Sequence, residues 1–72
     1  MSLFEMLSEI ENLDINTEIE ILFIDGKSMI GKYKGYTEAE DNEPNVSQID
    51  IEADDGTWYG IDETEIKNIE KV

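Results

Sequence analysis

Residues 18–36 read EIEILFIDGKSMIGKYKGY, two apolar-rich runs joined at Asp25-Gly26. Asp-Gly between two strand-like runs predicts a β-hairpin, because a two-residue turn that matches the twist of the strands needs positive φ angles, which Gly adopts at little cost. The stretch therefore predicts a small β protein built around this hairpin.

The first run of the hairpin is apolar on both faces of the expected strand. Ile19, Ile21 and Phe23 share one face, whereas Leu22 and Ile24 lie on the other, because side chains alternate along a strand. A strand of this kind needs cover on both faces. We expect an N-terminal helix to cover the second one.

The second run, from Lys27 to about Thr37, carries Gly31 and Gly35 inside the strand. Glycine weakens a strand interior unless the strand bends or another backbone comes close. Strong curvature of one strand is what closes a small barrel, so we expect the two glycines to be points of curvature.

The N-terminus carries the signature of a short amphipathic helix over residues 3–11. Ser2-Leu3-Phe4-Glu5 fits a capping box, in which the Ser hydroxyl and the Glu carboxylate each accept a backbone N–H at the helix start. Apolar residues follow at helical spacing: Leu3, Met6, Leu7 and Ile10. Because so short a helix is unstable alone, its apolar face must pack on the barrel or on another chain.

The rest of the chain continues the β pattern after an acidic loop at residues 38–45. The expected segments are a strand at 46–54 ending in an Asp-Asp-Gly turn, a strand at 57–61, a 3₁₀ turn at 62–65 and a strand at 66–72. We predict a single domain over residues 1–72, with a barrel over residues 18–72.

This layout resembles the SH3-like small barrels, and the Sm-like group most closely. The matching segments are Ile19–Gly31, with its apolar strand, Asp-Gly turn and following Gly, and Tyr59–Ile66, which is similar to the closing segment of the family. The resemblance implies a mainly β, five-stranded SH3-like (Sm-like) small barrel with a short N-terminal α-helix. It also implies that copies of the chain can associate through edge strands into a homo-oligomer, and the apolar face of the N-terminal helix offers a second surface for such association.

The RNA site of Sm-like proteins does not carry over to this sequence. That group has an Asp and an Asn around the bend after the second strand, and a basic residue before the Gly of the closing segment. Here Asp41, Asn42 and Asn45 have no register with the first motif, and Tyr59 precedes Gly60. A diverged Sm-like RNA-associated protein is therefore kept only as an alternative.

The charge balance is strongly acidic, with 19 Asp and Glu residues against five Lys and a net charge of −14. Such a surface repels nucleic-acid phosphates and attracts partners rich in Lys and Arg. We therefore expect a basic protein or peptide as partner and no direct nucleic-acid binding. Two other interpretations stay open. In one, the chain is a DNA mimic that occupies the binding site of a nucleic-acid-binding protein; in the other, the negative charge only keeps the protein soluble.

Catalytic chemistry has few residues to draw on, since the chain contains neither His nor Cys. General acid–base catalysis would have to use carboxylates, Lys or Tyr. No pair of carboxylates lies in an apolar setting that would raise the pKa of one of the two groups. We expect no enzyme activity, no cofactor and no metal. The acidic loop offers oxygen ligands for Ca²⁺, but its spacing matches no calcium loop, and a solvated loop is favoured.

No apolar run approaches the ~18–20 residues of a membrane span, and no cationic segment precedes an apolar one at the N-terminus. A soluble, cytoplasmic protein without a membrane partner is the expectation.

Aromatic residues near the acidic loop are the best candidates for a binding site. SH3-like barrels commonly place aromatic rings beside an acidic loop to hold a cationic or proline-rich peptide. Rings can instead fill a thin core, which we expect for Tyr33 and for one of Trp58 and Tyr59, while Tyr36 fits either role. The predicted partner-binding residues are Tyr36, Glu38, Glu40, Asp41, Glu43, Trp58 and Tyr59.

Overall fold

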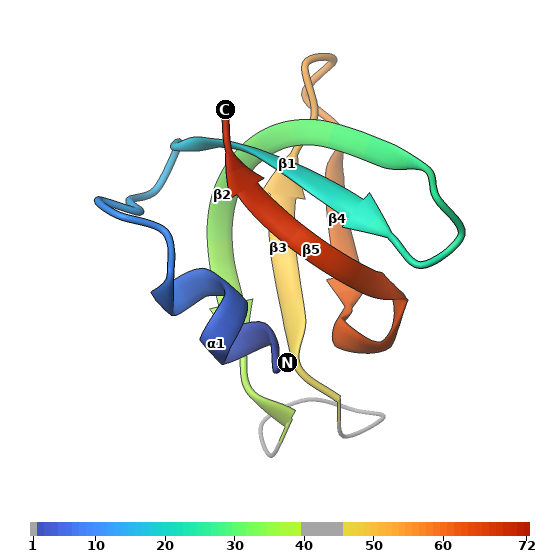
Figure 1. Ribbon diagram of the computed structural model, residues 1–72. Helices are drawn as coiled ribbons and strands as arrows, with labels where there is room; N and C mark the ends of the chain where they lie inside the picture. The colour runs from blue at the N-terminus through green and yellow to red at the C-terminus, as the bar shows by residue number, and fades with distance from the viewer. Residues whose placement is uncertain (1, 40–45) are drawn as a thin grey trace.

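The computed structural model describes residues 2–39 and 46–72, and within them the chain forms one short helix and a five-stranded antiparallel sheet (Figure 1). The elements, in chain order, are α1 (Leu3–Ser8), β1 (Glu18–Phe23), β2 (Ser28–Thr37), β3 (Gln48–Glu52), β4 (Trp58–Asp62), the 3₁₀ turn η2 (Glu63–Glu65) and β5 (Ile66–Lys71). The prediction of a mainly β fold with an N-terminal helix and five strands is confirmed.

The sheet curves without closing. Its strand order is β4-β3-β2-β1-β5, so β4 and β5 are its two edges. The 3₁₀ turn η2 connects these two strands along the chain, but β4 and β5 are not hydrogen-bonded neighbours in the sheet. β2 is shared by two partners: residues 28–32 pair with β1 and residues 32–37 with β3. Figure 1 shows β2 as the long, bent strand that carries this change. The sequence predicts a barrel, and the structure has a barrel-like sheet that stays open.

Gly31 lies where β2 passes from one partner to the other. A Cβ at this position would lie 3.0 Å from the carbonyl oxygen of Glu52 and 3.2 Å from Cδ1 of Ile51. A side chain here would force the neighbouring strand to shift, so glycine suits this close approach.

Gly35 follows a β-bulge in the same strand. Tyr33 pairs with Ile51 and Gly35 with Asp50, so Lys34 is the extra residue between two successive pairs. A bulge bends a strand and increases its twist. The two glycines are therefore the points of curvature that the sequence predicts.

The first hairpin turn differs from the two-residue turn expected at Asp25-Gly26. In this turn, the Phe23 N–H donates to the Lys27 carbonyl at 2.8 Å, so the loop has three residues and ends in Gly26 at φ 91°. The Asp25 carboxylate accepts the Lys27 N–H at 3.0 Å. The turn before β4 repeats this pattern and ends in Gly56 at φ 86°. A three-residue loop needs a left-handed residue only at its last position, where Gly stands.

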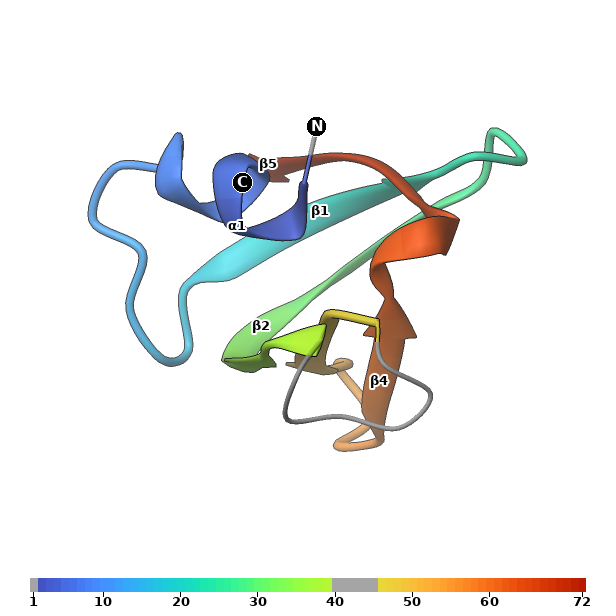
Figure 2. The same ribbon diagram turned by 90° about the horizontal axis from the view of Figure 1, so that it is seen from below.

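The core lies between the concave face of the sheet and α1. The buried side chains are Leu3, Met6 and Leu7 from α1, Ile19 and Ile21 from β1, Ile49 and Ile51 from β3, and Ile61, Ile66 and Ile69 from the last strands. All belong to one cluster. Figure 2 shows α1 beside β5 and β1, with β4 on the opposite side of the molecule.

The helix covers the inner face of the sheet, so the prediction that it covers the second face of β1 is wrong. Ile24, which was expected on that second face, is 68% exposed, and Ile30, opposite Glu20 on β2, is also exposed. A helix whose apolar side chains join Ile19 and Ile21 in one core cannot also reach the other side of the sheet.

The start of α1 matches its prediction and its end does not. Both bonds of the capping box are present: Ser2 Oγ accepts the Glu5 N–H, and Glu5 Oε1 accepts the Ser2 N–H, each at 3.1 Å. The helix ends at Ser8 rather than at residue 11, and a turn follows it in which Asn12 adopts a positive φ of 56°. Ile10 still packs against the core from this turn.

Candidate partner-binding surface

The register of β2, β3 and β4 arranges the candidate residues in cross-strand rows. On the inner face the rows are Tyr33–Ile51–Tyr59 and Tyr36–Ile49–Ile61. On the outer face they are Lys32–Glu52–Trp58, Gly35–Asp50–Gly60 and Thr37–Gln48–Asp62. Because directly opposite residues share a face, Trp58 and Tyr36 lie on opposite sides of the sheet.

The structure does not bring the predicted site residues together. Tyr36 is half-buried and packs against the core, and Glu38 is exposed just beyond the end of β2. Trp58 stands opposite Glu52, at the far end of β3 from the acidic loop, which is roughly 13 Å along a strand. Three predicted residues lie outside the described part of the chain: Glu40, Asp41 and Glu43.

Trp58 and Tyr59 are both exposed, at 61% and 42%, so the expectation that one of them fills the core is wrong. They are neighbours on β4, an edge strand, where a ring on either face meets solvent on one side. Tyr33, one strand further in, is half-buried and packs against the core as expected. Burial, followed by the nearby charge of Asp50, raises the pKa of the Tyr33 hydroxyl.

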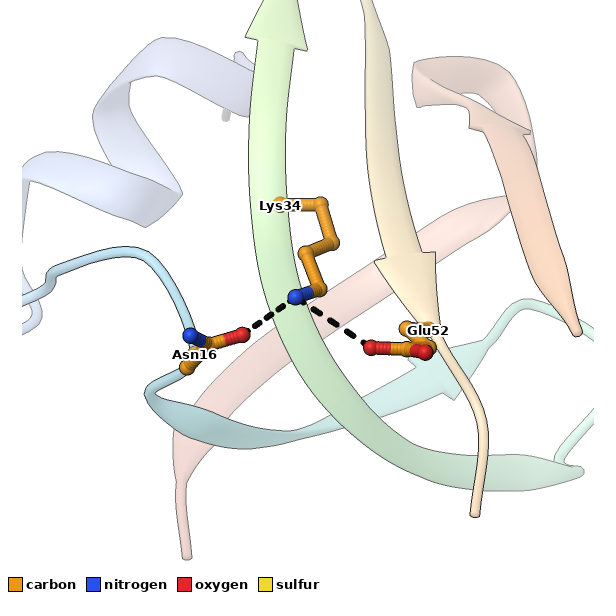
Figure 3. A network of polar contacts seen from close by, with 3 residues as sticks. All are labelled: Asn16, Lys34 and Glu52. Carbon is orange, nitrogen blue, oxygen red and sulfur yellow. Dashed lines mark hydrogen bonds and ion pairs between the residues drawn. The ribbon is translucent and has the colours of Figure 1, made fainter. Parts of the chain in front are cut away.

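Lys34 links the loop before β1 to the outer face of the sheet (Figure 3). Its Nζ donates to the side-chain oxygen of Asn16 and forms an ion pair with Glu52 Oε1 at 3.2 Å. The same ammonium lies 5.5 Å from the ring centroid of Trp58, within the range of a cation–π contact. Lys34 lies two residues after Lys32, and strand alternation places both side chains on this face. The Trp58 ring therefore already accepts one ammonium group.

Carboxylates continue around Trp58 on the β3 and β4 side of the outer face. Asp50 accepts a hydrogen bond from Gln48 Nε2 at 2.9 Å, and the Gln48 amide lies directly over Gly60. In the turn before β4, the Thr57 N–H donates to Asp55 at 2.9 Å, and these Thr57 hydrogen bonds lower the pKa of that carboxyl. Asp55 thus places a carboxylate in the turn that precedes Trp58.

Sequence reasoning missed Lys34, whose ammonium lies over the Trp58 ring, and the two partners of that ammonium, Asn16 and Glu52. Asn16 is 18 residues from Lys34 in the chain, and only the fold joins them. The signal for Lys34 was strand alternation, which places its side chain on the same face as that of Lys32.

The other half of the outer face has a pocket of about 150 Å³ lined by Glu20, Leu22, Ser28, Asn68 and Glu70. Glu20 and Glu70 are direct cross-strand partners. Within residues 2–39 and 46–72, no three carboxylates are grouped so as to hold a metal ion. In the same part of the chain, no helix has the length and apolar character needed to cross a membrane.

Comparison of the chain with known protein families, with curated protein sequences and with solved structures gives no match.

Proposed function

We propose that this chain is a small, non-enzymatic binding module that recognises a basic protein or peptide through the outer face of β3 and β4. One observation carries the proposal. Trp58 presents an exposed ring on that face, beside carboxylates, and an ammonium group of the chain itself already sits 5.5 Å from it. A ring in this setting is suited to hold a Lys or Arg side chain of a partner.

The charges on the face are ordered from one strand to the next. The lysines, Lys32 and Lys34, stand on β2, whereas Glu52 and Asp50 stand on β3 and Asp62 ends β4. An approaching cation meets negative charge on the β4 side, where the ring is exposed. The net charge of −14 adds a long-range field that speeds the encounter with a basic partner.

The proposal is tested by calorimetric titration of the chain with a short peptide in which lysines alternate with threonines. We expect binding at about 0.01 M salt that weakens at about 0.15 M, because screening shortens the reach of surface charges. The matched peptide with glutamine in place of lysine should not bind. If the lysine peptide fails to bind at either salt concentration, the proposed function is wrong.

A variant pair ties the binding to this ring. Trp58→Ala should weaken lysine-peptide binding about 2- to 30-fold, the range of one cation–π contact. The control is Phe4→Ala, since Phe4 is an equally exposed ring, at 61%, on α1. Equal affinities for the two variants would place the binding elsewhere on the molecule. The alternatives of a DNA mimic and of a diverged Sm-like RNA-associated protein stay predictions.

A further inference from the structure

We infer that the basic partner binds as an extended segment that adds a strand to the free edge of β4. This inference rests on the proposed function and states how the partner is held. Backbone hydrogen bonds along the edge would supply affinity, and alternate side chains would reach Trp58 and the neighbouring carboxylates.

The backbone of β4 has an open hydrogen-bonding edge. Among the described residues β4 pairs only with β3. The Thr57 carbonyl accepts the Ala53 N–H, and the Ser47 carbonyl accepts the Glu63 N–H, both at 2.9 Å. Because inward and outward groups alternate in an antiparallel pair, every second residue between these two bonds turns its N–H and C=O away from β3. The residues that do so are Trp58, Gly60 and Asp62.

This edge lacks the devices that protect the other edge of the sheet. Edge strands are commonly blunted by lysines, prolines, bulges or a covering element. β5 carries Lys67 and Lys71, its ladder with β1 contains a register shift, and α1 packs beside it. β4 has the sequence WYGID, with no Lys or Pro, and its ladder with β3 runs through five pairs without a shift. The contrast marks β4 as the edge that stays available.

Charge selects a basic segment over a second copy of the chain. Asp54 and Asp55 precede β4, and Asp62, Glu63 and Glu65 end it or follow it. Two β4 edges paired antiparallel would bring these two acidic ends together, at a net charge of −14 for each copy. Like charges on paired strands oppose association, whereas lysines in the same positions are attracted.

The same residues that offer backbone groups also place their side chains on the outer face. Trp58 and Asp62 flank Gly60, which leaves the middle of the edge without a side chain of its own. In an added strand, side chains at every second position would lie on this face, next to the ring and to Asp62. A segment with alternating lysines fits this spacing.

The first test uses two forms of the lysine–threonine peptide that are N-methylated at alternate amides, one on the lysines and one on the threonines. The two forms have equal charge, but only one has its methyl groups on the edge that meets β4. We expect one form to lose binding at least roughly tenfold while the other binds as the parent peptide does. Equal binding of the two forms, with the parent peptide still bound in a salt-dependent way, would overturn strand addition and leave the proposed function intact.

The second test removes one donor from the edge of the protein. Asp62 has φ −69°, the angle that proline requires, and the preceding residue is in a strand. We therefore expect Asp62→Pro to keep the fold while it deletes an outward N–H. Asp62→Asn is the control for the lost charge. We expect the proline variant to bind the parent peptide about three- to tenfold more weakly than the asparagine variant. Equal affinities of these two variants, both folded by circular dichroism, would contradict the inference.

Discussion

A side chain far along the sequence accepts a hydrogen bond from the start of α1. The first N–H groups of a helix have no partner inside the helix. Here the Leu3 N–H donates to the carboxylate of Glu63, 60 residues further along the chain, in η2. Since Leu3 is fully buried, this N–H depends on the Glu63 carboxylate for its hydrogen bond. The bond ties the helix to the link between the two edge strands.

Glu63→Ala should lower the free energy of unfolding by about 1–3 kcal/mol, because it leaves a donor without its charged acceptor. Glu65→Ala removes the same charge two residues later, from an exposed side chain, and should change the stability by no more than about 0.5 kcal/mol. Urea denaturation of both variants measures the difference. A Glu63→Ala variant as stable as Glu65→Ala would show that this bond does not hold the helix.

The capping box makes the stability depend on pH in a defined direction. Hydrogen bonds from the Ser2 backbone and side chain lower the pKa of Glu5 from its ordinary value of 4.5. A carboxyl with a lowered folded pKa stabilises the fold above its unfolded pKa, and this contribution is lost as the pH falls through the folded pKa.

We therefore expect the stability difference between the natural chain and Glu5→Gln to be largest near about pH 7 and to vanish toward about pH 3. Glu11→Gln removes the same charge from an exposed site just beyond α1 and serves as the control for the general loss of negative charge. Thermal unfolding over this pH range gives both differences. Curves of the same shape for the two variants would contradict the role of the cap.

At the scale of elements, β2 organises the fold because it is paired with β1 over one half and with β3 over the other. Gly31→Ala should destabilise the protein by about 1–3 kcal/mol, since the new Cβ would lie 3.0 Å from a ladder carbonyl that has little room to move. Ser28→Ala, an exposed change in the same strand, should be nearly neutral. If both variants unfold at the same denaturant concentration, the close approach at Gly31 is not what shapes the strand.

Most elements follow from the sequence because their signals are local. Alternation, the two Asp-Gly turns and the capping box depend on neighbouring residues, and the strands lie within two residues of their predicted bounds. The side of the sheet that α1 covers is a tertiary property. The apolar pattern of β1 marks both faces alike, and it cannot tell that Leu3, Met6 and Leu7 complete the inner one.

The candidate site was predicted less well than the fold, for a similar reason. One of Trp58 and Tyr59 was expected in the core, because large rings favour burial. Their exposure follows from the place of β4 at an edge, which depends on strand order rather than on local sequence. The grouping of Trp58 with Lys34, Glu52 and Asn16 likewise requires the register of β2 on β3.

At the scale of the whole molecule, the two edges of the sheet differ in packing and in charge. The α1 and β5 side is packed and carries Lys67 and Lys71, whereas the β4 side combines an open backbone edge, an exposed ring and acidic residues at both ends. On the proposed function, this side of the sheet is where charge, ring and backbone would act together on a basic segment.

A nuclear magnetic resonance titration of the ¹⁵N-labelled chain with the lysine–threonine peptide tests this account most directly. We predict that the indole N–H of Trp58 and the backbone amides of Gly60 and Asp62 shift most, while amides of α1 and β5 stay in place. Shifts centred on β5 and α1, or no shifts at a peptide concentration that saturates the calorimetric signal, would contradict it.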